Sequence, residues 1–375
     1  MQISVWEAES FFAPQDVVVI GGGFVGLWSA LTLKQRQPHL KVSILDRGVI
    51  PTGASGRNAG FACFGSPTEL LHDAAMMGWD NMLALVHMRY TGLQRIRQYF
   101  PAHHIGFESC GGYELMPPSA DKSQWQEHIL HLNKALQPIT GTGETFCIAS
   151  NNGFRFGNTS FLIKTHLEGA LHAGLLLQRL TQQAQALGVQ IFTDTAVQHM
   201  QQGDAGWAVH TNQHFVLQCN QVLVCTNAFA TDLLPYVEVE PARGQVILTS
   251  PIHHLHWKGT FHAEEGYYYF RNLGNRVLLG GARHTDFGPE ATTQMQTTES
   301  LQQKLEEYLD QVILPNKKND YTIERRWSGI MGMGPVKGPI IKEVQPQLFC
   351  AVRMSGMGVA LAPEVAQQVC NLMGH

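Results

Sequence analysis

The sequence has few charged side chains and no excess of basic ones. Charged residues make up 15% of the 375-residue chain, and 26 Lys and Arg against 30 Asp and Glu give a net charge of −4. A protein that coats nucleic acid needs a basic surplus, so nucleic acid is not an expected partner. The 44% of hydrophobic residues argues against a disordered chain. A chain of this length is expected to form two or three domains.

The cysteines are few and scattered. There are seven, an odd number, and no two form a CxxC pair, which argues against a disulfide framework and a zinc site. This usage favours a reducing, cytoplasmic location. The histidine groups His103-His104 and His253-His254-x-His256 have no acid or cysteine partner at ligand spacing, so no metal site is expected.

A signal peptide and a continuous apolar run are also missing. The first 15 residues include Glu7 and Glu9 but no Lys or Arg, which argues against a secretory signal peptide. The longest uncharged stretch, residues 17–33, is interrupted by three consecutive glycines that begin at Gly21. We therefore expect a strand, a turn and a helix there, and no transmembrane segment.

A dinucleotide-binding fingerprint occupies this stretch. The apolar, β-branched run 16–20 predicts a buried strand, and the glycine loop 21–26 reads GGGFVG. Residues 27–35 then predict a helix, and residues 41–46 predict a second strand that ends in Asp46. This is GxGxxG in the strand–turn–helix–strand–acid context of nucleotide-binding folds.

Each position in the fingerprint has a physical role. Gly21 permits the tight turn, Gly23 lets backbone N–H groups approach a pyrophosphate, and Gly26 allows the helix to pack closely on the strand. The helix N-terminus adds partial positive charge near the phosphates. Asp46 would accept hydrogen bonds from ribose hydroxyls. The expected dinucleotide contacts here are Gly21, Gly23, Phe24, Val25, Gly26 and Asp46.

The dinucleotide can be NAD or FAD, because an acid at the end of the second strand suits both. The fingerprint lies near the N-terminus, and no second fingerprint for a nicotinamide cofactor follows it. This favours FAD and leaves an NAD-dependent dehydrogenase as an alternative.

The residues that follow Asp46 indicate a protein family. Residues 47–61 read RGVIPTGASGRNAGF, which resembles the second signature of the D-amino-acid oxidase superfamily of flavoproteins, the group that includes glycine oxidase and sarcosine oxidase. The resemblance implies that this stretch wraps the pyrophosphate and the flavin ring. The implied FAD contacts are Arg47, Ala54, Ser55, Arg57, Asn58, Ala59, Gly60 and Phe61.

The resemblance continues to the C-terminus. It covers the strand 188–197, the turn 222–229, the PxRGQ-like segment 241–245, the hairpin 266–281 and the closing segments at 327–329 and 354–360. The FAD contacts that it implies in these segments are Val197, Asn227, Ala228, Gly329, Gly356, Met357, Gly358 and Val359.

The implied fold class is α/β with two lobes. One lobe is a Rossmann-like FAD-binding domain with three ββα layers, over residues 1–84, 150–234 and 322–375. The other is a substrate-binding domain built on an antiparallel sheet, over residues 85–149 and 235–321. The sequence pattern itself predicts a long helix over 161–187 and another over 300–312.

The implied reaction is oxidation of the C–N bond of an amine or amino acid, by hydride transfer to the flavin, to an imine that hydrolyses. Oxygen or another electron acceptor would reoxidise the flavin. The alternation of Tyr267 and Tyr269 on a predicted strand places both on one side, where they can hold the substrate, and Arg271 shares their side. Packing in the core is the alternative for the tyrosines, and a surface position is the alternative for Arg271.

One position departs from the family pattern. Glycine-oxidase-like members carry a substrate-binding arginine where this chain has Met331, which cannot form a bidentate contact with a carboxylate. Either another arginine (Arg271, Arg243 or Arg353) replaces it, or the substrate is a secondary amine or a larger amino compound. An FAD-binding subunit without turnover is a further alternative. Residues 322–349 contain no cysteine, so non-covalent FAD is expected.

Overall fold

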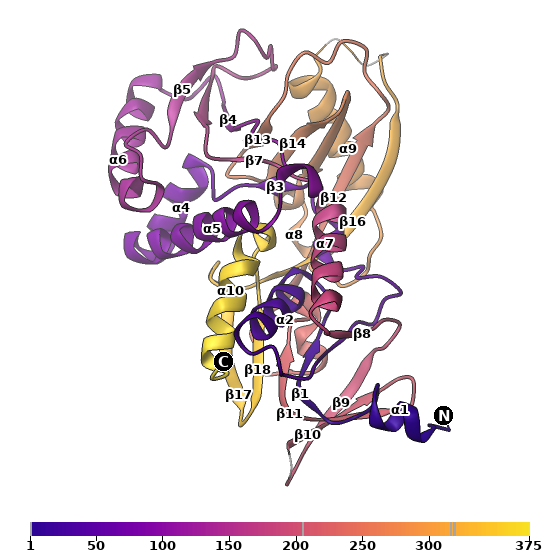
Figure 1. Ribbon diagram of the computed structural model, residues 1–375. Coiled ribbons are helices and arrows are strands. Elements are labelled where there is room, and N and C mark those ends of the chain that lie inside the picture. The colour runs from indigo at the N-terminus through magenta and orange to yellow at the C-terminus, as the bar shows by residue number, and fades with distance from the viewer. Residues whose placement is uncertain (1, 205, 316, 318–319) are drawn as a thin grey trace. The chain divides into compact units, whose positions relative to one another are not determined.

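The computed structural model describes residues 2–204, 206–315, 317 and 320–375 (Figure 1). The chain divides into two compact units. The first unit consists of Met1–Arg57, Ala173–Ala242 and Met331–His375, and the second of Asn58–His172 and Arg243–Ile330. The domain bounds that the family resemblance implies stay a prediction.

A mainly parallel, eight-stranded sheet forms the framework of the first unit. Its strands are β1 (Gln15–Ile20), β2 (Val42–Leu45), β8 (Gln190–Phe192), β9 (Val197–Gly203), β10 (Gly206–Thr211), β11 (Val216–Val224), β17 (Ile340–Gln345) and β18 (Leu348–Val352). The strand order is β17-β18-β11-β1-β2-β8, and β10 and β9 extend antiparallel from β11. The four parallel pairs, β18·β11, β11·β1, β1·β2 and β2·β8, bring the C-terminal ends of their strands to one edge.

The first unit also contains helices. They are α1 (Val5–Glu9), α2 (Phe24–Arg36), α3 (Ala54–Arg57), α7 (Ala173–Ala186) and α10 (Gly358–Leu372), with a 3₁₀ segment η2 (Asn227–Asp232). α2 is buried all round from Phe24 to Lys34, as a helix that is apolar on every side must be. It packs against α7 and α10, and Figure 1 shows the three helices side by side.

A largely antiparallel, eight-stranded sheet organises the second unit, in the order β16-β12-β15-β14-β13-β4-β6-β5 with one parallel pair, β13·β4. Its strands are β4 (Gly112–Met116), β5 (Cys147–Ser150), β6 (Phe161–Thr165), β12 (Glu240–Thr249), β13 (Thr260–Ala263), β14 (Tyr268–Leu273), β15 (Arg276–Gly281) and β16 (Ile323–Met333), and a separate pair is formed by β3 (Phe61–Ala62) and β7 (Gly169–Ala170). The helical segments are α4 (Pro67–Met77), α5 (Trp79–Tyr99), η1 (Ala102–His104), α6 (Lys122–Thr140), η3 (Arg283–Thr285), α8 (Phe287–Glu290), α9 (Glu299–Tyr308) and a π-helical turn, η4 (Leu309–Ile313).

The two faces of this second sheet differ. One carries an aromatic core in which Phe261 and Phe270 stack at 4.8 Å and pack with Leu301 and Leu305 of α9. The other carries a smaller cluster, which we call the Tyr269 face. Its members are Ala59, Phe61, Val246, Leu248, Tyr269, Leu278 and Trp327.

These two sheets confirm the predicted fold class. The helix predicted over 161–187 is wrong in its first part, because residues 161–165 form strand β6 and the helix α7 begins only at Ala173. The buried run FLIKT of β6 pairs with β4 and β5, and this tertiary pairing overrides the local pattern. None of the described helices is long and apolar enough to cross a membrane.

Candidate active site

The glycine loop of the first unit joins β1 to α2. Gly21 has a φ of +108°, and a Cβ there would lie 2.9 Å from the Cys225 carbonyl oxygen. A Cβ on Gly26 would lie 2.0 Å from the Gly21 carbonyl oxygen, so only glycine fits at that point of α2. Gly23 is the N-cap and offers no side chain to the helix; instead the Ser55 Oγ accepts a hydrogen bond from Phe24 N at 2.9 Å. Val25, the next residue of α2, is buried.

Asp46 follows β2 directly and fixes this loop. Its carboxylate accepts hydrogen bonds from Gly22 N at 2.8 Å and from Gly48 N at 2.9 Å. The next residue, Arg47, places its guanidinium carbon 3.7 Å from the ring centroid of Phe229 in η2. A cation lying over an aromatic face is favourable, so this contact joins the end of β2 to the turn after β11.

The turn after β11 holds the closing segment of the chain. Asn227 adopts a left-handed φ of +48°, and its Oδ1 accepts hydrogen bonds from Arg353 N at 3.0 Å and Met354 N at 3.2 Å. Gly332 lies against it, since a Cβ there would be 2.7 Å from the same oxygen. One asparagine therefore ties η2 to the end of β16 and to the segment that leads into α10.

Met331 and Gly356 meet in this closing segment. Gly356 has a φ of +80°, and a Cβ there would lie 3.5 Å from the Met331 Sδ. Met357 is the N-cap of α10, whose first residues are Gly358 and Val359. The other predicted cofactor residues of this unit are Val197, which begins β9, Ala228 in η2, and Ala54, Ser55 and Arg57 in α3. The glycine loop, the end of β2, η2 and the closing segment therefore lie in one region of the first unit.

In the second unit, the end of the predicted flavin signature is fixed by backbone contacts. Gly60 N donates to the Asn58 Oδ1 at 2.9 Å, and Gly60 has a φ of +73°. Arg271 is buried, and its Nη1 donates to the carbonyl oxygens of Gly60 and Leu171, both at 2.9 Å. Its Nε donates to the Asn272 carbonyl oxygen at 3.0 Å. Arg271 therefore holds the loop at Gly60, and its role toward a substrate stays a prediction.

A polar side chain, His262, lies beside Phe61 and Tyr269 of the Tyr269 face. The Phe61 ring lies edge-on to the rings of His262, at 5.1 Å, and of Tyr269, at 5.9 Å. His262 and Tyr269 are also direct partners across β13 and β14. Burial raises the pKa of Tyr269 to about 12, which keeps its hydroxyl protonated, and lowers the pKa of His262 to about 4, which keeps its imidazole neutral. Gly329 lies two residues beyond Trp327 on β16.

His262 is a residue that sequence reasoning missed. It is 8% exposed, and its Nε2 has no hydrogen-bond partner among the residues that the structure describes. Burying such an atom unpaired is costly, so it is the kind of atom that a ligand satisfies. The short run TFHA of β13 carries no motif, and only the strand pairing reveals the neighbourhood of this histidine.

The comparisons with known proteins agree with this geometry. Residues 16–372 match the family described as "DAO: FAD dependent oxidoreductase". The chain belongs to this family. It is therefore an FAD-dependent oxidoreductase. A probable oxidoreductase OrdL of Haemophilus influenzae is 24% identical, over 92% of this chain and 80% of that protein. The bifunctional protein ThiO/ThiG of Synechocystis sp. is 24% identical, over 96% of this chain and 51% of that protein.

Solved structures share the DAO fold. The L-proline dehydrogenase of P. horikoshii superimposes with a TM-score of 0.77 at 17% identity and covers 96% of this chain and 93% of its own. The glycine oxidase of Bacillus cereus gives a TM-score of 0.74 at 19% identity, over 96% and 97% of the two chains. At these identities the likeness shows the fold.

The arginines that were candidates to replace Met331 are occupied in this DAO-family chain. Arg243 is buried and donates to both carboxylate oxygens of Glu290, each at 2.7 Å. Arg353 donates to the carbonyl oxygens of Gly338 at 2.9 Å and Glu238 at 3.4 Å. Together with Arg271, all three are engaged in contacts within the protein.

Buried acids hold the segment that follows the flavin signature. Glu168 accepts hydrogen bonds from Phe64 N at 2.8 Å and Gly65 N at 3.4 Å. Glu114 accepts from Thr68 N at 3.0 Å and from the Ser66 hydroxyl at 2.9 Å. Burial is the main cause that raises the pKa of Glu114 to about 7 and that of Glu168 to about 8. No motif in the sequence marks these acids.

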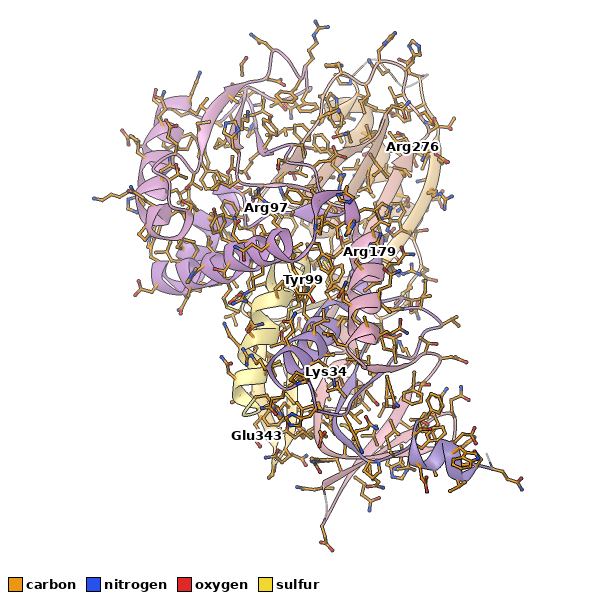
Figure 2. The ribbon with its side chains drawn as sticks, in the orientation of Figure 1. Lys34, Arg97, Tyr99, Arg179, Arg276 and Glu343 are labelled. Atoms are coloured by element: carbon orange, nitrogen blue, oxygen red, sulfur yellow. The ribbon has the colours of Figure 1, made fainter. Side chains whose placement is uncertain are left out.

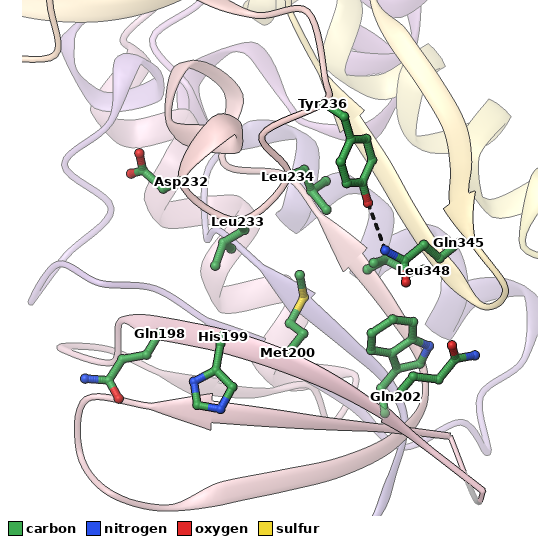
Figure 3. A pocket seen from close by; sticks show the side chains of 11 residues that line it. Gln198, His199, Met200, Gln202, Asp232, Leu233, Leu234, Tyr236, Gln345 and Leu348 are labelled. Carbon is green, nitrogen blue, oxygen red and sulfur yellow. Dashed lines mark hydrogen bonds between the residues drawn. The ribbon is translucent and has the colours of Figure 1, made fainter.

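A cavity of about 250 Å³ lies elsewhere in the first unit (Figure 3). It is lined by Gln198, His199, Met200, Gln202, Trp207, Asp232, Leu233, Leu234, Tyr236, Gln345 and Leu348. In Figure 3 the Tyr236 hydroxyl, at one wall, accepts a hydrogen bond from the Gln345 amide at 3.3 Å. None of the predicted site residues lines this cavity.

Proposed function

We propose that this chain binds FAD without a covalent link and oxidises the C–N bond of an amine or amino acid. The observation that carries the proposal is the arrangement in the first unit, where the glycine loop, Asp46, Asn227 and the closing segment come together in a DAO-family chain. Names of structural relatives, L-proline dehydrogenase and glycine oxidase, support the choice of substrate class.

The residues of the first unit fit the cofactor. Gly23 adds no side chain at the N-terminus of α2, and a Cβ there would come 2.9 Å from the Ser55 Oγ, which accepts from Phe24 N. A helix N-terminus with glycine at its N-cap suits a pyrophosphate, and Asp46 suits a ribose. When bound, FAD supplies the acceptor for the hydride that leaves the α-carbon of the amine.

The other parts of the reaction fall to side chains of the second unit. The neutral side chains of Tyr269 and His262, which are partners across β13 and β14, orient the substrate and exclude water from it. An amine that binds unprotonated needs no strong base, and the imine that forms hydrolyses in water. Tyr267 lies just before β14, where its ring contacts His284 and Phe287 at 4.7 and 5.9 Å, so it can contribute a hydroxyl from the strand end.

Anaerobic titration of the purified protein tests the reaction. Glycine, sarcosine, L-proline and iminodiacetate are added separately, and bleaching of the flavin absorption is followed. Bleaching by one of them supports amine oxidation. If FAD is bound but none bleaches it, with or without a dye acceptor, these four probes are not substrates. The second candidate, a flavoprotein module without turnover, is then favoured by Met331, at the position where the family resemblance implies an arginine in glycine-oxidase-like members.

Gly23→Val tests the cofactor site. The valine side chain meets Ser55 and blocks the approach of a phosphate, so we expect at least a tenfold loss of bound FAD, measured by absorbance after denaturation. Gly143→Val is the matched control, because Gly143 has no atom within 4 Å of an added Cβ and lies in the second unit. Stoichiometric flavin in Gly23→Val would contradict the placement of the site.

A further inference from the structure

Strand β9 ends one branch of the sheet in the first unit and leaves one of its edges unpaired. It pairs with β10 on one side, and in the part of the chain that the structure describes no strand pairs with its other side. A register shift between His210 and Thr211 lies at the start of β9, and residues 199–203 pair regularly with β10. These residues therefore present N–H and C=O groups along a largely exposed edge.

This edge lacks the protection that the other described edges of the two large sheets have. Proteins protect an edge strand by making it short or by placing charges on it. β8 has three residues and β5 has four. β17 carries Lys342 and Glu343, of which Glu343 is labelled in Figure 2. β16 carries Glu324, Arg325 and Arg326. β9 has seven residues, VQHMQQG, without Lys, Arg, Asp, Glu or Pro.

The hairpin of β9 and β10 is held in place by side-chain contacts. His199 and His210 are partners across it, and their rings stack at 4.1 Å. Trp207 of β10 is buried, and its Nε1 donates to the Pro346 carbonyl oxygen at 3.1 Å, between β17 and β18. An edge that already has strand conformation costs little to order when another strand binds to it.

The cavity of about 250 Å³ shown in Figure 3 lies beside this strand. Gln198, Met200 and Gln202, at alternate positions of β9, line it. Residues that pair across two strands place their side chains on the same face of the sheet. A residue that pairs with Met200 from an added strand therefore directs its side chain toward the cavity. Leu233 and Leu234 also line the cavity, and they suit an aliphatic group.

The sequence around β9 is acidic. Residues 180–242 contain neither Lys nor Arg, and their acids are Asp194, Asp204, Asp232, Glu238 and Glu240. Asp194 precedes β9 and Asp204 follows it directly. In an antiparallel pair of two β9 strands, the Asp194 end of one copy lies at the Asp204 end of the other. A second copy of this chain would therefore meet like charges, whereas a basic strand would meet opposite ones.

We propose that β9 is a docking edge for an extended, basic segment of another protein, which joins the sheet as a further strand. Main-chain hydrogen bonds to residues 199–203 supply affinity, and the cavity takes one aliphatic side chain. Lys or Arg near the ends of the segment lies beside Asp194 and Asp204. This surface is no part of the proposed amine oxidation, so the failure of either proposal leaves the other standing.

A synthetic strand tests the docking edge. The probe is the capped nonapeptide KTVTLTVTK, which has apolar side chains on one face and lysine at both ends. Its Kd for the full chain, purified with FAD, is measured by fluorescence anisotropy. Two further forms carry N-methyl groups on the amides of one edge or of the other. Because an added strand pairs through one edge, one form should bind as the parent does and the other about tenfold more weakly. Absence of binding by the parent, equal binding by all three peptides, or loss of binding by both methylated forms overturns the proposal.

Substitution of the two flanking acids tests the charge of the partner. Asp194→Asn combined with Asp204→Asn should weaken KTVTLTVTK about three- to tenfold at low salt. Asparagine tolerates the left-handed φ of +53° at position 194. The control combines Glu127→Gln with Glu144→Gln, at exposed positions of the second unit, and changes the net charge equally. It should leave the Kd unchanged, and an equal effect of the two double variants overturns the assignment of a basic partner.

Amide hydrogen exchange locates the bound strand and tests the second copy as occupant. KTVTLTVTK should slow exchange in residues 197–203 and leave residues 323–333, in the edge strand β16, unchanged. Slowing elsewhere and not in β9 overturns the proposal. If residues 197–203 exchange slowly without peptide at high protein concentration, and faster on dilution, a second copy of this chain covers the edge, and the proposal of a basic partner is wrong.

Discussion

Glu168 keeps a carboxyl group where its charge is costly. The side chain is buried, its Oε1 is used by two backbone N–H groups, and the Glu69 and Glu114 carboxyls add repulsion. Its pKa of about 8 in the folded protein is above the ordinary 4.5 of the unfolded chain. The folded state therefore binds more protons between these pH values, and the stability that this gives below pH 4.5 is lost as the pH rises through about 8.

Glu168→Gln should remove this pH dependence. The amide oxygen of glutamine can still accept a hydrogen bond from Phe64 N, and the side chain carries no charge. The free energy of unfolding of the variant, compared with that of the unsubstituted protein, should therefore be higher at pH 8.5 than at pH 5 by roughly 1–3 kcal/mol. Urea unfolding at the two pH values measures the difference. Glu144→Gln, at an exposed glutamate in the loop after α6, is the control and should show no such trend. An equal loss of stability for Glu168→Gln at both pH values would contradict the expected direction of the pH dependence.

The roles of some single residues can be predicted from the sequence, and those of others cannot. Gly21, Gly26 and Asp46 are predictable, because each role depends on a turn, a close approach or a strand end within one βαβ unit. Arg271 was placed on the side of Tyr269 by strand parity, but parity does not say that its guanidinium reaches the Gly60 carbonyl.

At the scale of elements, the success of a prediction depends on how local the stabilising contacts are. β1, the glycine loop and α2 are contiguous, so their sequence determines them. β6 is stabilised by β4 and β5 on either side, and its pattern alone was taken for the start of a helix. β14 begins at Tyr268, one residue later than the alternation predicted, which leaves Tyr267 in the turn beside Ala282.

Asn227 joins three elements through one oxygen, and its substitution separates hydrogen bonding from backbone strain. Asn227→Leu leaves Arg353 N and Met354 N without their acceptor and strains a left-handed backbone, so we expect a loss of roughly 2–4 kcal/mol in unfolding free energy and weaker FAD binding. Asn227→Gly relieves only the strain, and Asn227→Asp keeps an acceptor. Urea unfolding should rank the variants Asp, Gly, Leu from most to least stable. A glycine variant as stable as the aspartate variant would show that the hydrogen bonds matter little.

At the scale of the whole molecule, the two units are bound together by the path of the chain. The chain passes between them at residues 57–58, 172–173, 242–243 and 330–331. Two of these passages lie inside strands, since β12 spans Glu240–Thr249 and β16 spans Ile323–Met333. Neither unit is a continuous segment, so neither can lose its structure without releasing strand residues of the other. We therefore expect both to unfold in one cooperative transition.

Ligand linkage tests this cooperativity. FAD is proposed to bind through the first unit, and at a free concentration of 100 times its Kd it stabilises the folded state by about 2.7 kcal/mol. Trp207 of the first unit and Trp257 of the second are both 3% exposed, so each reports on its own unit. With fluorinated tryptophan and the variants Trp207→Phe and Trp257→Phe for assignment, ¹⁹F NMR follows the two signals in urea. Their midpoints should coincide without FAD and should rise together with it. If FAD raises the Trp207 midpoint and leaves that of Trp257 in place, the units unfold independently, and the strands that run through both do not couple them.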